Sequence, residues 1–473
     1  MRREGLEEVL SRARELVTPS ADEERRLRAV AAEVLRALSD CARGHGLSVE
    51  VEVEGSVAKG TWLPGDRDID VFLLFDRRTS LEELRYWGLR LAREAARALG
   101  CGFEERYAEH PYLRLSYKGY EVDVVPSYRV ESGDEVVTAV DRTRLHTRYV
   151  LSKADERLKV EVRLLKRFMK AVGVYGAEVK VGGFSGYLCE LLVIHYGSFL
   201  GVLRAARGWR PWRVVVDPGG HYSEAERGKL RRAFKSPLVV IDPVDRTRNA
   251  AAAVTLQRFS EFVAASRAFL ERPSLKFFIE EEVEPMSRGE LEAELEERGT
   301  GLIALRFDVG ELSPDVLWGQ VHRTVRNVLN FLKQYKFEVV NWGAWSDDRS
   351  IAIVLLELSS LTLSPVELHS GPPVGSPEEP NFLRKYLGSA VAGPFIVDGK
   401  WYVLRRRKYA DAVALLRERI HLAGLAKSLL KALREGRFRV YVNSEVAEAS
   451  SDEGYRRYLR KWLLRRYHWL GEG

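Results

Sequence analysis

Cysteine and methionine are scarce in this chain of 473 residues, which has only three of each. Cys41, Cys101 and Cys189 are widely separated, and they show neither the paired spacing of a zinc or redox motif nor the density of a disulfide-rich fold. We therefore expect three ordinary apolar thiols. No apolar run is long enough to span a bilayer, and the opening MRRE does not resemble a signal peptide. The sequence predicts a cytoplasmic protein with no membrane segment.

Charge of both signs is abundant instead. The 75 basic and 68 acidic residues leave a net charge of +7 and a pI of about 9.1. This excess is modest, so the placement of the basic residues is more informative than their number. They cluster with aromatic residues at 204–213, 401–409 and 455–469. Such clusters suit a phosphate backbone with stacked bases, although a charge run on a helix is more often a solvated face.

The most informative stretch is residues 55–75, GSVAKGTWLPGDRDIDVFLLF. Its second half, residues 68–75, is predicted to be a strand, and Asp68 and Asp70 then lie on one face because strand side chains alternate. Asp123 lies in a second apolar run, EVDVV, which also predicts a buried strand. Carboxylates in such strands are costly to desolvate unless a cation binds them, and hard divalent cations prefer oxygen ligands. The pattern therefore predicts a metal site.

The turn that opens this stretch supplies groups for an anion. Gly55 lets the backbone approach a phosphate closely, and the amides that open a helix attract negative charge. Ser56 adds a hydroxyl group and Lys59 adds a positive charge one turn later. Each part alone is a weak signal. Together, a phosphate-binding turn and three carboxylates predict a phosphoryl-transfer site, and the arrangement resembles the nucleotidyltransferase superfamily that includes DNA polymerase beta.

The remaining patterns predict an α+β multidomain protein, with roughly three domains by length. Residues 1–150 are expected to form a nucleotidyltransferase head with a small mixed sheet. Residues 151–272 read as a helical central domain. In residues 273–473 a strand, a helix and hairpins predict a ferredoxin-like α+β body followed by a tail. Residues 371–380, rich in glycine and proline, are interpreted as a linker.

Several single elements are also predicted. Ser20 and Glu23 form the pattern of a capping box before a helix over residues 21–43. Further helices are expected over residues 250–270 and 455–469. The apolar face of the last one is expected to pack on protein rather than on RNA.

A series of short motifs carries a more specific resemblance. In chain order they are AEHPY (108–112), EVDVVPSY (121–128), AVDRT (139–143), VRLLK (162–166), YGAE (175–178), GFSGYLCE (183–190) and DPVDRTRN (242–249). With residues 55–75, this order resembles the archaeal, class I CCA-adding enzymes, which are tRNA nucleotidyltransferases. The resemblance is dense over roughly residues 47–268 and looser beyond.

The resemblance implies roles for particular residues. The catalytic carboxylates that hold two Mg²⁺ ions would be Asp68, Asp70 and Asp123. The contacts to the triphosphate and ribose of the nucleotide would be made by Ser56, Lys59, Thr143, His146, Lys166 and Tyr175. Arg248 matches the arginine that helps to read the incoming base. Relatives can carry Glu at the position of Asp68 and Arg at that of Lys59, which alters geometry while preserving the chemistry.

The implied activity is template-independent addition of C, C and A to the 3′ end of tRNA from CTP and ATP, with release of pyrophosphate. Residues 273–473 would hold the acceptor arm of the tRNA. Two other interpretations are open: a poly(A)- or oligoadenylate-type polymerase with the same head, and a non-catalytic RNA-binding protein on this scaffold. The sequence does not set the oligomeric state, and a homodimer is one expectation.

Overall fold

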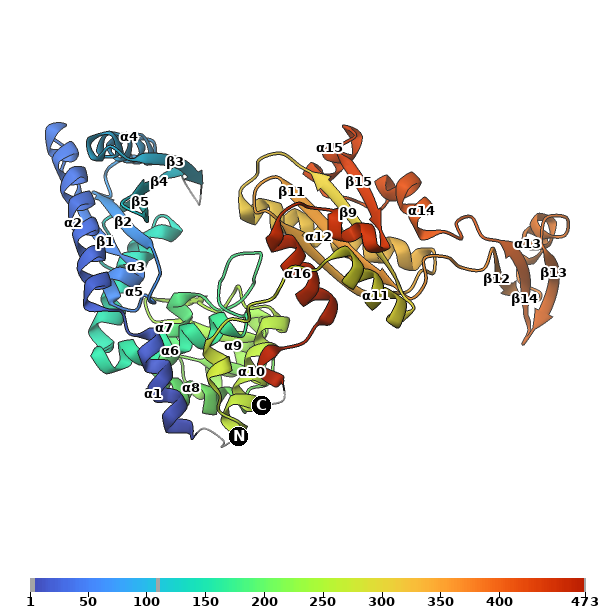
Figure 1. Ribbon diagram of the computed structural model, residues 1–473, viewed down its shortest axis with the longest axis horizontal. Helices are drawn as coiled ribbons and strands as arrows, with labels where there is room; N and C mark the ends of the chain where they lie inside the picture. Colours follow the sequence, from blue (N-terminus) through green and yellow to red (C-terminus); the bar gives the residue numbers. More distant parts are fainter. Residues whose placement is uncertain (1–4, 108–110, 472–473) are drawn as a thin grey trace. The chain divides into compact units, whose positions relative to one another are not determined.

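The computed structural model describes residues 5–107 and 111–471 (Figure 1). The chain forms two compact units. The first runs to Glu281 and includes the residues from Arg466 onward, and the second spans Glu282–Arg465.

The head is built on a five-stranded sheet in the order β1-β2-β5-β4-β3, in which only the β2–β5 pair is parallel. Its elements are α2 (Ala21–Gly44), β1 (Glu50–Glu54), α3 (Gly55–Lys59), β2 (Asp68–Phe75), α4 (Leu81–Leu99), β3 (Gly102–Tyr107), β4 (Pro111–Tyr117) and β5 (Tyr120–Tyr128). Helix α1 (Leu6–Val17), which the sequence analysis placed in the head, packs instead in the core of the helical central part through Val9, Leu10, Ala13 and Val17. The predicted capping box of α2 is confirmed, because Ser20 accepts from the Glu23 amide and the Glu23 carboxylate accepts from the Ser20 amide.

Helices α2 and α4 cover one face of this sheet. Ile69, Val71 and Leu73 of β2 and Val122 and Val124 of β5 are completely buried in that core. The alternation of strand side chains therefore leaves Asp68, Asp70 and Asp123 on the opposite face.

The central part of the first unit is mainly helical, as predicted. It contains η1 (Gly133–Glu135), η2 (Ala139–Asp141), α5 (Arg142–Lys153), α6 (Glu156–Ala171), α7 (Gly186–Tyr196), α8 (Phe199–Ala206), α9 (Glu224–Phe234), α10 (Leu256–Glu271) and η3 (Leu275–Phe278). It also contains a small sheet that the sequence analysis did not predict, formed by β6 (Val214–Val216), β7 (Leu238–Asp242) and β8 (Asp245–Asn249). The prediction of one helix over residues 250–270 is wrong at its start, because Thr255 caps α10 and residues 250–253 form a turn.

An aromatic cluster closes the core of this helical part. Phe168 stacks on Phe277 with ring centroids 5.7 Å apart, and Phe277 in turn contacts Trp469 at the same centroid distance. Trp469 belongs to η6 (His468–Leu470). Residues 275–278 and 466–470 therefore pack in the first unit, although the sequence analysis grouped them with residues 273–473. The reason is their aromatic side chains, which complete this core.

The second unit has a ferredoxin-like body, as predicted. Its antiparallel sheet has the strand order β10-β11-β9-β15. In chain order, its elements are β9 (Gly301–Asp308), α12 (Pro314–Gln334), β10 (Val339–Ser346), β11 (Ile351–Leu358), α14 (Ala412–Arg419), η4 (Ile420–Leu422), α15 (Lys427–Arg434) and β15 (Phe438–Val442). Helix α12 packs on one face. The other face is covered by α11 (Arg288–Arg298), η5 (Asn443–Glu448) and α16 (Glu453–Leu464).

Helix α16 is the predicted tail helix, and its apolar face does pack on protein. Tyr455, Leu459 and Leu463 are buried in the body. The helix ends at Leu464, short of the predicted residue 469, because Arg465 adopts a left-handed conformation with φ of 47°.

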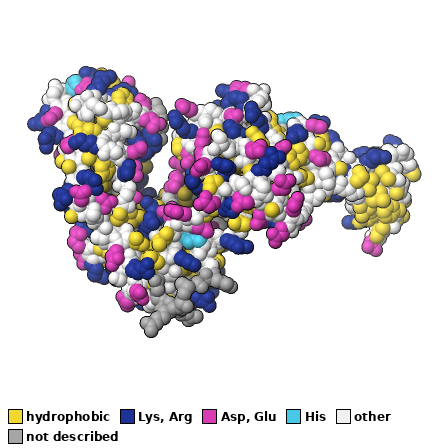
Figure 2. All heavy atoms as spheres, viewed as in Figure 1, with side chains coloured by type: hydrophobic (Ala, Val, Ile, Leu, Met, Phe, Trp, Pro, Cys, Tyr) yellow, Lys and Arg dark blue, Asp and Glu magenta, His cyan; other side chains and the backbone are white. Residues whose placement is uncertain are grey.

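A small tail sheet within the second unit consists of β12 (Val366–Pro373), β14 (Lys400–Arg406) and β13 (Ala392–Val397), with α13 (Glu379–Tyr386) packed on it. Its hairpin, formed by β13 and β14, turns at Asp398–Gly399. The interpretation of residues 371–380 as a linker is wrong at both ends, since residues 371–373 end a paired strand and residues 379–380 begin α13. Figure 2 shows apolar side chains gathered on this tail.

Within the described residues, no single helix is long and apolar enough to cross a membrane. Helices α7 and α8 pass that test only as a pair, and they are bent by 90°.

Candidate nucleotidyltransferase site

The three predicted carboxylates lie on the same face of two adjacent strands of the head sheet. Asp70 and Asp123 are directly opposite one another in the parallel β2–β5 register, and Asp68 lies two residues before Asp70 on the same face. The Gly55 corner presses against this group, because a Cβ on Gly55 would lie 2.1 Å from Asp70 Oδ2. Gly55 also has a φ of 67°, which an L side chain rarely adopts. The corner and the carboxylates therefore form one site.

The electrostatics of this group are unbalanced. Burial, followed by the neighbouring Asp123 carboxylate, raises the pKa of Asp70 to about 6. Burial also raises the pKa of Asp68. Crowded carboxylates of this kind disfavour their charged forms and suit a hard divalent cation as counter-charge.

Arg114 is a neighbour of the carboxylates that the sequence analysis missed. It lies opposite Asp123 in the β4–β5 register and binds it through both carboxylate oxygens, at 2.6 Å for Nε and 2.7 Å for the second nitrogen. Among the described residues, no group of three or more His, Cys, Asp or Glu side chains is arranged to hold a metal ion as it stands. The donor chemistry fits Mg²⁺, but in this conformation Arg114 occupies the carboxylate of Asp123. The alternation of the strand LRLSY was the available signal, since it places Arg114 on the acidic face.

The two predicted lysines are held by a residue with no predicted role, Glu190 of α7. Glu190 accepts from Lys59 Nζ at 2.7 Å and from the Thr61 hydroxyl at 2.6 Å, and Lys166 Nζ lies 3.5 Å from it. All three charged side chains are buried. Burial alone would raise the pKa of Glu190, but the two ammonium groups outweigh it and lower that pKa. Burial lowers the pKa of Lys166. A charged residue inside the apolar run of α7 was the sequence signal for this cluster.

His146 and Arg248 meet at another residue without a predicted role, Asp242 at the end of β7. Asp242 Oδ2 lies 3.0 Å from His146 Nε2 and accepts from Arg248 at 2.6 Å. Its Oδ1 accepts from the Tyr187 hydroxyl at 3.0 Å. Burial favours the neutral acid, but the His146 and Arg248 contacts outweigh it and lower the pKa of Asp242 to about 2. The site thus contains a permanent buried anion.

Tyr187 joins these two clusters. Its ring stacks on the His146 ring with centroids 3.8 Å apart and planes inclined by 22°. Lys59 Nζ also lies over this ring, 5.4 Å from the Tyr187 ring centroid. The predicted phosphate-end and base-end residues are therefore connected by direct contacts.

The other predicted nucleotide contacts surround this chain of side chains. Ser56 lies in the first turn of α3, and its carbonyl oxygen accepts from the Thr61 amide at 3.0 Å. Thr143 lies in the first turn of α5, and both residues are half-buried. Tyr175 points toward the start of α7, where a Cβ on Gly186 would lie 3.0 Å from the Tyr175 hydroxyl and 3.4 Å from Lys166 Nζ. Residues 108–110 of the AEHPY motif lie outside the described residues.

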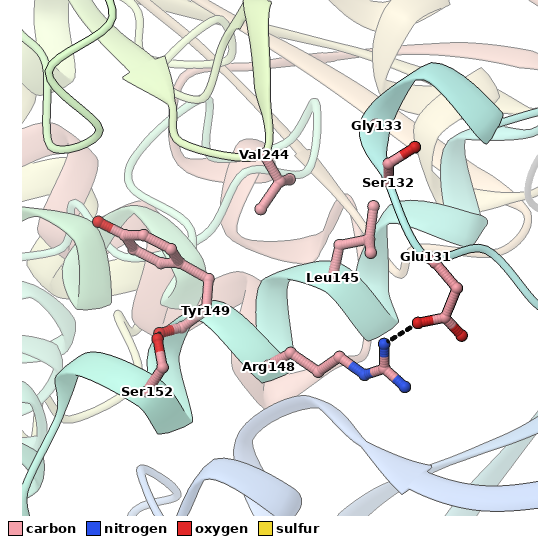
Figure 3. A pocket seen from close by; sticks show the side chains of 8 residues that line it. All are labelled: Glu131, Ser132, Gly133, Leu145, Arg148, Tyr149, Ser152 and Val244. Atoms are coloured by element: carbon pink, nitrogen blue, oxygen red, sulfur yellow. Dashed lines mark hydrogen bonds and ion pairs between the residues drawn. The ribbon is translucent and has the colours of Figure 1, made fainter.

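A pocket of about 370 Å³ opens beside the Asp242 turn rather than at the carboxylates. Figure 3 shows that Leu145, Arg148, Tyr149 and Ser152 of α5 line it, facing residues 131–133 and Val244, and that Arg148 is ion-paired with Glu131. Gly133 approaches closely here, since a Cβ on it would lie 2.1 Å from the Val244 carbonyl oxygen. The loop after β5 is thereby packed against the turn after β7.

Three family models match successive parts of the chain. They are described as nucleotidyltransferase domain over residues 34–146, tRNA nucleotidyltransferase, second domain, over residues 160–279, and CCA-adding enzyme, C-terminal domain, over residues 298–443. A solved structure described as that of a cytoplasmic RNA terminal U-transferase covers 58% of this chain and 98% of its own, with a TM-score of 0.44 and 18% identity.

Two relatives match most of the chain. The CCA-adding enzyme of Pyrobaculum islandicum is 42% identical over 86% of this chain and 91% of its own length. The CCA-adding enzyme of Methanosarcina barkeri is 38% identical over 97% of this chain and 98% of its own length. Because such identity extends over nearly the whole of both relatives, and the family models follow in the same order, the chain belongs to the CCA-adding enzymes.

Proposed function

We propose that Asp68, Asp70 and Asp123 carry out the chemistry by which this member of the CCA-adding family adds C, C and A to the 3′ end of tRNA. The reaction uses CTP and ATP, needs no nucleic-acid template and releases pyrophosphate. The observation that carries the proposal is the register of β2 and β5, which sets Asp70 beside Asp123 next to the Gly55 corner.

In the proposed reaction the terminal 3′ oxygen of the tRNA bonds to the α-phosphorus, and the bond from that phosphorus to the pyrophosphate oxygen breaks. The hydroxyl proton passes to water. Asp68, Asp70 and Asp123 would hold two Mg²⁺ ions, whose chemistry when bound is to acidify the 3′ hydroxyl and to neutralise the leaving pyrophosphate. For Asp123 to take this part, Arg114 has to release it.

The triphosphate is proposed to lie at the Gly55 corner. The backbone amides at the start of α3 and the Ser56 hydroxyl group would bind phosphate oxygens. Lys59 and Lys166 add positive charge whose position is fixed by Glu190. Thr143, His146 and Tyr175 are proposed to contact the triphosphate and ribose. All of these residues lie on the α3, α5 and α6–α7 segments that surround the corner.

Base selection is assigned to Arg248. Its guanidinium is anchored at one nitrogen by Asp242 and has several further N–H donors. Cytosine and adenine both present a ring-nitrogen acceptor beside an exocyclic amine, whereas uracil and guanine carry an N–H at that position. An Arg248 N–H placed against this edge can therefore donate to the ring nitrogen of cytosine or adenine. With uracil or guanine it would face another N–H donor, so these bases are rejected.

The domain roles follow the sequence analysis. Residues 1–150 are proposed as the catalytic head, residues 151–272 as the nucleotide-recognition domain, and residues 273–473 as the tRNA-binding part, which reads the acceptor arm through its backbone and shape.

We also propose that the enzyme works in the cytoplasm as a homodimer. The exposed apolar side chains of the tail support a protein contact; they include Leu368, Leu387, Phe395, Ile396 and Val397.

The test uses tRNA that lacks its CCA end, with Mg²⁺ and with CTP and ATP supplied separately and together. Asp70→Ala and Asp123→Ala are expected to abolish addition while tRNA binding, measured by filter retention, survives. Asp76→Ala is the matched control, because Asp76 follows the same strand and its side chain is 41% exposed. Near-normal turnover in either site variant contradicts the carboxylate assignment. Long A tails from the native enzyme would indicate a poly(A)-type polymerase, and no extension at all would indicate a non-catalytic RNA-binding protein.

A further inference from the structure

Asp242 has no proposed role so far, yet its carboxylate makes hydrogen bonds to several of the residues in the candidate site. It lies at the end of β7, has no solvent exposure, and contacts side chains from three separate elements. These are His146 of α5, Tyr187 of α7 and Arg248 of β8, at 3.0, 3.0 and 2.6 Å. The Val244 amide adds a fourth hydrogen bond at 3.1 Å. Both carboxylate oxygens are therefore engaged twice.

The Arg248 contact differs from the other two in its exposure. The Arg248 side chain is 39% exposed, whereas Asp242 is fully buried. Only one guanidinium nitrogen is bonded to Asp242. Because the guanidinium is a rigid planar fork, holding one nitrogen restricts the positions that the other donors can reach. The buried carboxylate thus sets where the remaining donors of Arg248 point.

The same carboxylate also fixes the stack beside Arg248. Tyr187 and His146 bind opposite oxygens of Asp242, and their rings stack face to face. This stack leads on to Lys59, whose ammonium lies over the Tyr187 ring. Through these contacts the Asp242 carboxylate links Arg248, the proposed base-reading residue, to Lys59, the proposed phosphate-binding residue.

We infer that Asp242 is a positioning residue for base selection, which acts by holding the Arg248 guanidinium in the direction that reads the base. This inference rests on the proposed role of Arg248. Asp242 does not touch the nucleotide in this scheme, and its effect on base choice passes through Arg248. Stability alone is a poor explanation for it, since a buried ion pair is often no more stabilising than a well-packed apolar pair.

The test is a double-mutant cycle on base discrimination. Native enzyme, Asp242→Asn, Arg248→Gln and the double variant are compared in the first addition to tRNA lacking its CCA end, and the ratio of kcat/KM for CTP to that for UTP is measured. Asparagine keeps the size of Asp242 and an acceptor for Tyr187, but it loses the charge that holds Arg248. We expect each single variant to lower the ratio by roughly tenfold or more. The double variant is expected to match Arg248→Gln alone.

Asp217→Asn is the matched control. Asp217 is also a buried aspartate of the helical part, and it accepts from the Tyr222 amide at 2.8 Å with Arg227 4.0 Å away. This variant is expected to retain the native CTP-to-UTP ratio even if its stability falls. Asp242→Glu, which keeps the charge but moves it by one methylene group, carries the same test if Asp242→Asn does not fold.

The outcomes separate the two levels of inference. An unchanged ratio in both Asp242 variants, with a lowered ratio in Arg248→Gln, overturns the positioning role and leaves the role of Arg248 standing. A double variant whose loss is the product of the single losses shows that Asp242 acts independently of Arg248, and this also overturns the inference. An unchanged ratio in Arg248→Gln overturns the proposed role of Arg248 itself.

Discussion

Replacing Asp70 by Asn is expected to stabilise the metal-free protein while it abolishes activity. Asp70 is half-buried, faces Asp123 across the β2–β5 register and presses against the Gly55 corner. Asparagine has nearly the same size and removes the charge. The charged carboxylate of Asp70 therefore lowers the free energy of unfolding, and the difference in stability between the variant and the native protein measures that loss.

The magnitude follows from the pKa of Asp70, which burial and the Asp123 carboxylate raise from 3.8 to about 6. A pKa difference of about two corresponds to roughly 3 kcal/mol. Since the folded pKa lies above the unfolded one, the folded protein keeps a proton that the unfolded chain has released between about pH 4 and pH 6. The stability contributed by this group thus falls as pH rises through that window, and the full penalty is present at neutral pH.

The assay is thermal unfolding of native protein and Asp70→Asn in EDTA at several pH values. At pH 7.5 the variant should be more stable by about 2–3 kcal/mol, or roughly 5 °C in Tm, and the difference should vanish near pH 4. Asp242→Asn is the contrast with the opposite sign, because the pKa of Asp242 is lowered to about 2 and loss of its charge should lower Tm. Mg²⁺ should then raise the Tm of the native protein more than that of Asp70→Asn. An Asp70→Asn variant that is less stable than native protein at neutral pH would refute the reasoning.

Three further substitutions test other parts of the fold. Glu190→Gln leaves Lys59 and Lys166 as buried cations without their carboxylate, and it should cost about 3 kcal/mol or more in urea unfolding; an unchanged midpoint would mean that water or movement relieves them. Ser20→Ala removes the capping box of α2 and should cost about 1 kcal/mol without altering addition, and a loss of activity would contradict a purely local role. Phe168→Ala opens a cavity in the aromatic core and should lower stability by about 3–5 kcal/mol, whereas a loss below ~1 kcal/mol would indicate that the core collapses around it.

Where local pattern decides the structure, the sequence was sufficient. The alternation in residues 68–75 predicted β2 to the residue, and Ser20 with Glu23 predicted the start of α2. The strand, helix and hairpin of residues 301–358 predicted the ferredoxin-like body. These elements were accessible because propensity, capping and hydrophobic period agree within each of them.

The partners of the site residues were not accessible in the same way. Glu190, Asp242 and Arg114 each bind a side chain that is distant in the sequence, or that lies across a sheet whose strand order periodicity does not reveal. The sheet of β6, β7 and β8 was missed for a related reason. Its strands are short, and β8 has the polar sequence DRTRN, which shows no apolar alternation. Tertiary hydrogen bonds, rather than local preference, hold such segments in place.

The aromatic contact between Trp469 and Phe277 has a consequence for the order of synthesis. The ribosome makes Phe277 early, but the whole of residues 282–465 is translated before its partner emerges. During that interval Phe277 in the nascent helical part lacks its contact with Trp469, while the intervening residues make up the second compact unit. A message cut short just before Trp469 would therefore yield a chain that carries every predicted catalytic residue on an unfinished core.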